Sequence, residues 1–325
     1  MANRRKRLTG KKRTAFRIFA VVLGLVLAAL LIEGTLRLIG LFVFPKAYQP
    51  ITDKDPSLPV FSILCVGDSH IEGKGSTNRR LYAFPSQLAI LLNHADPSHF
   101  YQVLNAGVPG HNSSQTLSML EQQLATGPPP DLVLWLSGKN NDHNLTDAYF
   151  LPDEVKGLGQ RGKVSYLLEN SRALRLGRIT VRRLEKLLTR SDLPEELNAE
   201  EMIHREQDRQ FLSAWIAEDL IRAKALTDKV GAKLVPVTYY LPVPYLIDAY
   251  KQARNQTGME FIDCRNFGLL FPAPKSRLVA GDGHPNDEGY VLIGRHVFVK
   301  LAEKGLVPIS RQQADAFLAA SPDTK

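Results

Sequence analysis

Cysteine is scarce in this chain, with only Cys65 and Cys264 among 325 residues. Two cysteines cannot build the dense disulfide framework of a small secreted domain. Cys65 lies in an apolar run and is expected to fill a buried strand as a small hydrophobic side chain. A bridge between the two cysteines stays open as an alternative. The sequence also lacks internal repeats and low-complexity segments, which argues against a repeat protein.

Acidic residues are missing from the first 17 positions, which carry eight basic side chains. Of the 41 Lys and Arg residues, eight lie in this tail, and the 33 that remain equal the 33 acidic residues. The net charge of +8 therefore belongs to the tail, because the rest of the chain is neutral. This distribution argues against a DNA-binding face, and we expect no nucleic-acid partner.

A long apolar run follows the basic tail. The fifteen residues from Ile18 to Ile32 would span roughly 22 Å as a helix, less than the hydrocarbon core of a bilayer. Apolar residues continue past Glu33, so a helix from about Phe16 to Leu41 is long enough to cross with some tilt. The basic flank should stay in the cytoplasm, which would place the remainder outside. A cleavable signal peptide is the alternative, but no small-x-small site follows Ile32, which favours an uncleaved anchor.

The pattern divides the chain into four parts. We expect a basic cytoplasmic tail over 1–17, a transmembrane anchor over 18–42, a proline-rich linker over 43–60 and a globular domain over 61–325. An insert at about 145–230 is mostly helical in pattern, and its first half is rich in Arg and Lys. Either the insert presents a solvated basic face, or it caps the active site and touches anionic lipid or an anionic polymer.

Strand and helix patterns alternate through the globular domain. The expected strands cover 61–66, 100–106, 131–136, 233–239 and 260–263, and the expected helices cover 85–94, 113–125 and 286–304. Such alternation predicts an α/β fold of three layers, with a central parallel sheet of about five strands covered on both faces.

A serine follows the first expected strand. Gly67 permits a tight turn after the strand, and Ser69 then lies at the carboxyl edge, where parallel sheets place their ligands. A helix starting just after Ser69 would favour developing negative charge there. Taken alone, Ser69 could equally be a helix N-cap.

Four short motifs in chain order resemble those of the SGNH (GDSL-type) hydrolase superfamily, three of them preceded by a strand. The first is Gly67-Asp68-Ser69 with Gly73 and Gly75 downstream. The others are Asn105-Ala106-Gly107-Val108-Pro109-Gly110, then Gly138-Lys139-Asn140, and finally Asp282-Gly283-His284-Pro285-Asn286. The resemblance covers about residues 61–143 and 231–305. It implies the flavodoxin-like arrangement of the sheet and an esterase that needs no cofactor or metal.

The resemblance also implies a role for each matching residue. Ser69 would be the nucleophile, His284 its general base, and Asp282 the acid that orients the imidazole. The backbone N–H groups of Ser69 and Gly110 and the side-chain amide of Asn140 would form the oxyanion hole. Glycine suits position 110 because the backbone must approach the substrate closely.

The sequence departs from the family pattern in three places. The family usually spaces acid and base as Asp-x-x-His, whereas Asp282 lies two residues before His284, so Asp263 or a backbone carbonyl are alternatives for orienting the imidazole. The usual Gly-x-Asn-Asp is also altered, with Asn140 as the best match and Asn141 as the alternative. His70 follows the nucleophile directly, and we interpret it as a packed or exposed histidine rather than a substrate contact.

Other functions must be weighed against an esterase. An O-acyltransferase would use the same site with a sugar hydroxyl as acceptor. Asp68 and His70 also resemble the first motif of two-metal phosphoesterases, but the later ligand motifs of those enzymes are missing. A non-catalytic membrane-tethered binding module is the third alternative. Among substrates, we expect an O-acylated envelope glycan first and a lysophospholipid second.

Overall fold

The computed structural model describes residues 10–42, 47–50, 54–142, 144, 173, 177, 206–265, 278–280 and 283–320. Most of the expected insert lies outside these residues, and so does Asp282, the expected orienting acid. The chain divides into two compact units. The first comprises Met1–Phe44 and Val164–Ser191, and the second comprises Pro45–Lys163 and Asp192–Lys325.

The first unit is dominated by one long helix, α1 (Gly10–Phe42). Its segment Thr14–Leu36 has a mean hydropathy of 2.7 and is long and apolar enough to cross a membrane. Large apolar side chains such as Leu25 and Leu31 are 67 % and 71 % exposed. The helix starts earlier than the sequence pattern indicated, because it includes the basic residues Lys11, Lys12 and Arg13.

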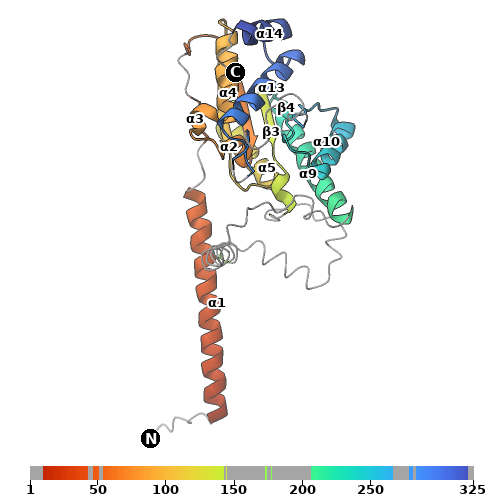
Figure 1. Ribbon diagram of the computed structural model, residues 1–325. Helices are drawn as coiled ribbons and strands as arrows, with labels where there is room; N and C mark the ends of the chain where they lie inside the picture. The colour runs from red at the N-terminus through yellow and green to blue at the C-terminus, as the bar shows by residue number, and fades with distance from the viewer. Residues whose placement is uncertain are drawn as a thin grey trace. The chain divides into compact units, whose positions relative to one another are not determined.

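A parallel sheet forms the centre of the second unit (Figure 1). Its strands are β1 (Val60–Gly67), β2 (Phe100–Gly107), β3 (Leu132–Leu136) and β4 (Lys233–Pro236), in the order β2-β1-β3-β4. The register pairs Gly67 with Gly107 and Leu136, so the three strands end at one edge. A single parallel bridge between Val237 and Ile262 lies where a fifth strand was expected. The predicted three-layer α/β architecture is confirmed.

Helices cover both faces of the sheet (Figure 1). On one face α4 (Phe84–Ala95) packs against β2 and against α13 (Asp287–Glu303). On the other, α5 (Ser113–Thr126) packs against β1 and α9 (Glu206–Lys229), which also contacts α10 (Pro244–Thr257). Short helices α2 (Ser69–Glu72) and α3 (Arg79–Tyr82) follow β1, and α14 (Arg311–Ala320) packs on α13.

Burial explains why the strands read as continuous apolar runs. Every residue of β3 is buried, and Trp135, its penultimate residue, is fully enclosed. Strands covered on both faces need apolar side chains at successive positions, not only at alternate ones. Cys65 fills such a position in β1, as the sequence predicted. Cys65 and Cys264 are both free, so the alternative of a bridge between them is wrong.

The chain just before β1 is also part of the second unit. Tyr48 forms an antiparallel bridge with Asn105 on β2, through Tyr48 N to Asn105 O at 3.0 Å and the return bond at 2.9 Å. The amide of Asn105 donates to the Tyr48 hydroxyl at 2.9 Å. Lys54 donates from Nζ to the carbonyl oxygens of Asn93 and Asp96. These contacts fix Tyr48 to β2 and Lys54 to the C-terminal end of the helix that precedes β2.

Candidate active site

Ser69 lies at the point where β1 turns into α2. Gly67 has no room for a side chain, because a Cβ there would meet the Ile71 side chain and the carbonyl group of Leu136. Asp68 caps α2, and its carboxylate accepts from the backbone N–H of His70 at 2.9 Å. β1 is flanked by β2 and β3, which are reached by connections in opposite directions, so Ser69 lies at the switch point of the sheet.

The hydroxyl of Ser69 is hydrogen-bonded to an imidazole from the other end of the domain. Ser69 Oγ and His284 Nε2 are 2.7 Å apart, although 215 positions separate them in the sequence. Ser69 is only 7 % exposed. A serine hydroxyl in contact with an imidazole nitrogen is the arrangement from which a base can remove the hydroxyl proton. The structure therefore brings together the two residues that the sequence proposed as nucleophile and base.

Contacts between two loops hold this pair together. The Tyr240 hydroxyl donates to the carbonyl oxygen of Gly283 at 2.6 Å, which fixes the residue just before His284. The Tyr290 hydroxyl on α13 donates to the carbonyl oxygen of Lys74 at 2.8 Å. Gly75 has φ +94°, and a Cβ there would lie 2.5 Å from the Pro285 carbonyl oxygen and 3.0 Å from His284 Cβ. The segment that follows Ser69, up to Gly75, and the segment around His284 and Pro285 therefore meet at van der Waals distance.

Asp68 is a buried carboxylate behind the Ser69 turn. Its Oδ2 accepts from the Tyr239 hydroxyl at 2.5 Å and from Asn140 Nδ2 at 3.3 Å. Burial opposes ionisation, but hydrogen bonds and charge from His70 and the hydrogen bond from Tyr239 outweigh it and lower the pKa of Asp68. Burial, followed by the Asp68 charge, raises the pKa of Tyr239 well above its ordinary value. The pair is therefore a neutral phenol donating to an ionised carboxylate.

His70 is packed, as the sequence interpretation favoured. It is 4 % exposed, and its ring meets the Tyr239 ring edge-on with centroids 4.8 Å apart. The ring centroid of His284 lies 4.9 Å away. His70 Nδ1 is 3.4 Å from Asp68 Oδ1. His70 is thus packed against the rings of Tyr239 and His284 and does not lie at the surface.

The two loops expected to supply oxyanion donors touch each other. Gly110 is exposed and has φ +79°, and a Cβ there would meet no described atom within 4 Å. Asn140 lies in the short 3-10 turn η1 (Lys139–Asp142), and its Nδ2 donates to the carbonyl oxygen of His111 at 2.8 Å. Asn140 therefore links η1 to the Gly110 loop and to Asp68 at the nucleophile turn.

Asn141, the alternative to Asn140, faces away from Ser69. It is fully buried, its Nδ2 donates to Ser113 Oγ at 2.7 Å, and its Oδ1 accepts from the Ser113 N–H at 2.9 Å. Asn105 has a structural role, because its Nδ2 links β2 to α2 by donating to the carbonyl oxygen of Ile71 at 2.7 Å. Of the two candidate amides in η1, Asn140 is the one directed toward the nucleophile turn.

Asp263, the alternative orienting acid, is engaged elsewhere. Its carboxylate accepts from Arg265 at Oδ1 and Oδ2, and from the Thr238 hydroxyl at 3.2 Å. Asp282 lies outside the described residues, so its contact with His284 stays a prediction. No group of three His, Cys, Asp or Glu side chains in the described ranges is placed to hold a metal ion.

Sequence reasoning missed two residues of this region. Tyr239 ends the expected strand 233–239, and its position at the carboxyl edge of the sheet was a usable signal. Asp219 on α9 had no signal, because it is one acid on a helix of mixed charge. It is fully buried, and its Oδ2 accepts from the hydroxyls of Ser113 at 2.6 Å and Ser114 at 2.8 Å. Burial raises the pKa of Asp219 to about 6, despite these two hydrogen bonds.

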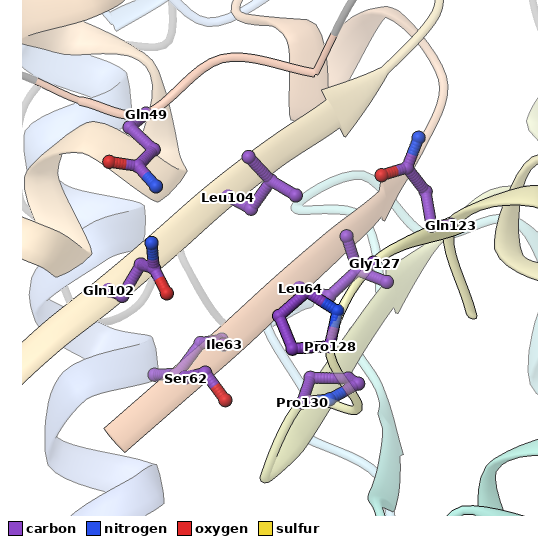
Figure 2. Close-up of a pocket in the computed structure, with 10 residues that line it drawn as sticks. All are labelled: Gln49, Ser62, Ile63, Leu64, Gln102, Leu104, Gln123, Gly127, Pro128 and Pro130. Carbon is purple, nitrogen blue, oxygen red and sulfur yellow. The ribbon is translucent and has the colours of Figure 1, made fainter. Parts of the chain in front are cut away.

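A hollow away from Ser69 lies along the first halves of β1 and β2 (Figure 2). Leu64 and Leu104 line it from the strands, and Gln123 and Pro128 from the end of α5. Neither Ser69 nor His284 lines it. It therefore takes no part in the site at the carboxyl edge.

Replacing Gly75 with alanine should separate the serine from the histidine. The new Cβ would push on Pro285 and His284, and a displacement of about 1 Å is enough to reduce the reactivity of such a pair by roughly a hundredfold. We expect labelling of Ser69 by a fluorophosphonate to slow by about ten- to a hundredfold. Gly231→Ala is the matched control, because Gly231 has φ +77° but no described atom within 4 Å of a Cβ. Equal labelling rates for the two variants would contradict this role of Gly75.

Asp219 should make the fold less stable as pH rises. Its pKa of about 6 exceeds the value of about 3.9 in an unfolded chain, so the folded state retains the proton to higher pH. The free energy of unfolding should therefore fall by about 2 kcal/mol between pH 4 and pH 6 on account of this group. Urea unfolding of the wild type and of Asp219→Asn from pH 4 to pH 7 measures it. A constant difference between the two proteins across this range would refute the expectation.

Comparisons with known proteins identify the family of the chain. The model of the GDSL-like Lipase/Acylhydrolase family matches residues 65–292. No curated protein sequence shows significant similarity to the chain. Similar solved structures include a lipase/acylhydrolase from Enterococcus faecalis, with a TM-score of 0.44, 15 % identity, and coverage of 74 % of this chain and 95 % of that one.

Two further similar structures are esterases of glycans. An acetyl-xylooligosaccharide esterase from Geobacillus has a TM-score of 0.44 at 16 % identity, with 77 % of this chain and 96 % of that one covered. A two-domain esterase active on acetylated mannans has a TM-score of 0.45 at 12 % identity, with 80 % of this chain covered. The match spans only 50 % of that two-domain protein. The family match covers more than half of the sequence and contains both Ser69 and His284, and the chain belongs to the GDSL-like lipase/acylhydrolase family.

Proposed function

We propose that this protein is a serine esterase that hydrolyses acyl esters through Ser69 and His284. The observation that carries the proposal is the 2.7 Å contact between Ser69 Oγ and His284 Nε2 at the carboxyl edge of the sheet. His284 removes the Ser69 proton as Oγ attacks the acyl carbonyl, and the same proton then passes to the leaving alkoxide. Water, activated by His284, releases the acid and regenerates Ser69.

Asp282 completes the proposed triad by accepting from His284 Nδ1. The support for this role is that Asp282 lies close to His284 in the chain, although the spacing is shorter than the family's, and that Asp263 is engaged with Arg265 and Thr238. A carboxylate there would hold one tautomer of the imidazole and stabilise the imidazolium formed during attack.

Three donors are proposed for the oxyanion. They are the backbone N–H groups of Ser69 and Gly110 and the side-chain amide of Asn140. In this structure Asn140 Nδ2 makes a 2.8 Å bond to His111 O and a longer 3.3 Å bond to Asp68. The longer bond is the one we expect the oxyanion to replace. Asp68 then keeps its hydrogen bonds from Tyr239 and the His70 N–H.

Ser69→Ala and His284→Ala should each abolish hydrolysis of p-nitrophenyl acetate. Because the two groups act as a unit, each loss should exceed about a thousandfold, and the double variant should be no worse than either single one. Ser310→Ala and His94→Ala are the matched controls, since both residues are exposed on remote helices or turns. Circular dichroism should show intact folds. Hydrolysis retained by Ser69→Ala would end the assignment.

The substrate is proposed from topology. We infer an O-acylated envelope glycan, because the basic tail favours a cytoplasmic N-terminus and an outward catalytic domain. A lysophospholipid is the alternative, and an O-acyltransferase would use the same acyl-enzyme with a sugar hydroxyl as acceptor. Incubation with acetylated glycan, with lysophospholipid and with an added sugar acceptor separates the three by their products.

We also propose that α1 is an uncleaved membrane anchor. The support is the apolar segment Thr14–Leu36, which directly follows a basic tail and whose large apolar side chains are exposed. The protein should stay in the membrane fraction after carbonate extraction, and its mature N-terminus should lie before α1. A soluble mature form that begins after Phe42 would show that α1 is a signal sequence.

A further inference from the structure

A buried carboxylate on α9 is hydrogen-bonded to the first turn of α5, the helix that follows the Gly110 loop. Asp219 has no exposed surface, and a single oxygen, Oδ2, accepts from the hydroxyls of both Ser113 and Ser114. Ser114 Oγ also accepts from Trp215 Nε1 at 2.8 Å, so its own proton is directed to the carboxylate. Each donor here has one acceptor, and the direction of each hydrogen bond is fixed.

The carboxylate sets the orientation of Asn141 through Ser113. Because Ser113 gives its only hydroxyl proton to Asp219, its oxygen can only accept from Asn141 Nδ2, at 2.7 Å. The backbone N–H of Ser113 then requires an acceptor, which is Asn141 Oδ1 at 2.9 Å. Both ends of the Asn141 amide are therefore specified, and the amide cannot rotate by half a turn without breaking two buried bonds.

Asn141 is the neighbour of Asn140 in η1, and Ser113 begins α5 just three residues after Gly110. Asp219 accepts from Ser113, and the bonds between Ser113 and Asn141 join the turn that carries the amide donor to the helix that follows the backbone donor. From the other side, Asp68 accepts from Asn140. The η1 turn lies between two buried carboxylates, one at the nucleophile turn and one on α9.

We propose that Asp219 is a positioning residue for the oxyanion hole, acting through Ser113 and Asn141 to fix the spacing between Asn140 and Gly110. This inference rests on the proposed esterase function. Asp219 touches no reacting atom, and its effect should appear in the transition state, where donors must fit the developing oxyanion, more than in the binding of substrate.

A buried charge is an inefficient way to hold a fold together. Removing a carboxylate from water is unfavourable even when hydrogen bonds partly compensate, and an apolar side chain in its place often stabilises a protein. Asp219 offers one thing that an apolar residue cannot, which is an acceptor for the Ser113 hydroxyl that fixes the direction of the bonds between Ser113 and Asn141. This trade of stability for geometry is typical of functional regions.

The test compares two substitutions of Asp219 in the full-length protein. Asp219→Asn can keep an oxygen at the position of Oδ2, whereas Asp219→Leu cannot accept from either serine. For p-nitrophenyl acetate we expect Asp219→Leu to reduce kcat by about ten- to a hundredfold with KM changed less than about twofold. Asp219→Asn should recover most of kcat. A rise in KM with kcat unchanged would overturn the inference.

A double-mutant cycle separates positioning from general destabilisation. In the background of Asn140→Ala the donor that Asp219 positions is gone, so Asp219→Leu should reduce kcat by less than about threefold further. Fully multiplicative losses would overturn the inference. Thr227→Val is the matched control, because Thr227 is buried on the same helix but its hydroxyl bonds only to the carbonyl oxygen of Lys224 among the described residues. It should leave kcat unchanged.

Ser113→Ala keeps the proposal falsifiable if Asp219→Leu does not fold. It removes the connecting hydroxyl while Ser114 still donates to Asp219, and it should also reduce kcat rather than raise KM. Ser69→Ala separates a failure of the proposed esterase function from a failure of the proposed role of Asp219. Hydrolysis that persists without Ser69 refutes the proposed function itself, whereas Ser69-dependent hydrolysis with normal kcat in Asp219→Leu and Ser113→Ala refutes only the role of Asp219.

Discussion

The meeting of two distant loops is the constraint on which the rest of this structure depends. A hydrogen bond such as that between Ser69 and His284 contributes only about 1 kcal/mol net, too little to bring together segments 215 positions apart. The loops are instead held by the packing around the pair. Tyr240 and Tyr290 donate hydrogen bonds to backbone carbonyl oxygens in these loops, and Gly75 allows close approach because it has no side chain. The contact between serine and histidine is a product of this packing.

The sheet supplies the other half of the geometry. In the order β2-β1-β3-β4, the parallel strand β1 lies inside the sheet, the connection from β1 leads to one side, and the connection from β2 to β3 crosses back to the other. The loops after β1, β2 and β3 therefore open at one edge, and they carry Ser69, Gly110 and Asn140 respectively. Strands that are buried on both faces make this edge rigid, because close-packed apolar side chains allow little movement.

Two buried carboxylates fix the loops beside them, and one of the two does so at a cost in stability. Asp68 and Asp219 are both enclosed, but their environments shift the pKa in opposite directions: hydrogen bonds and the charge of His70 lower that of Asp68, and burial raises that of Asp219. Each carboxylate accepts hydrogen bonds that fix a neighbouring loop. Because Asp219 is ionised at neutral pH, the free energy of unfolding is lower there than at acid pH. In return, the hydrogen bonds that Asp219 accepts define the spacing of the loops at the sheet edge.

Much of this could be predicted from the sequence, because the signals are local. Short apolar runs marked the strands, and four short motifs identified the family and the pair Ser69 and His284. Three-dimensional packing alone decided the rest. It directed Asn140 rather than Asn141 toward the nucleophile turn, kept Cys65 and Cys264 apart, and enclosed Asp219 against α5. These outcomes depend on which side chains meet across elements far apart in the chain, and no spacing within a single segment encodes them.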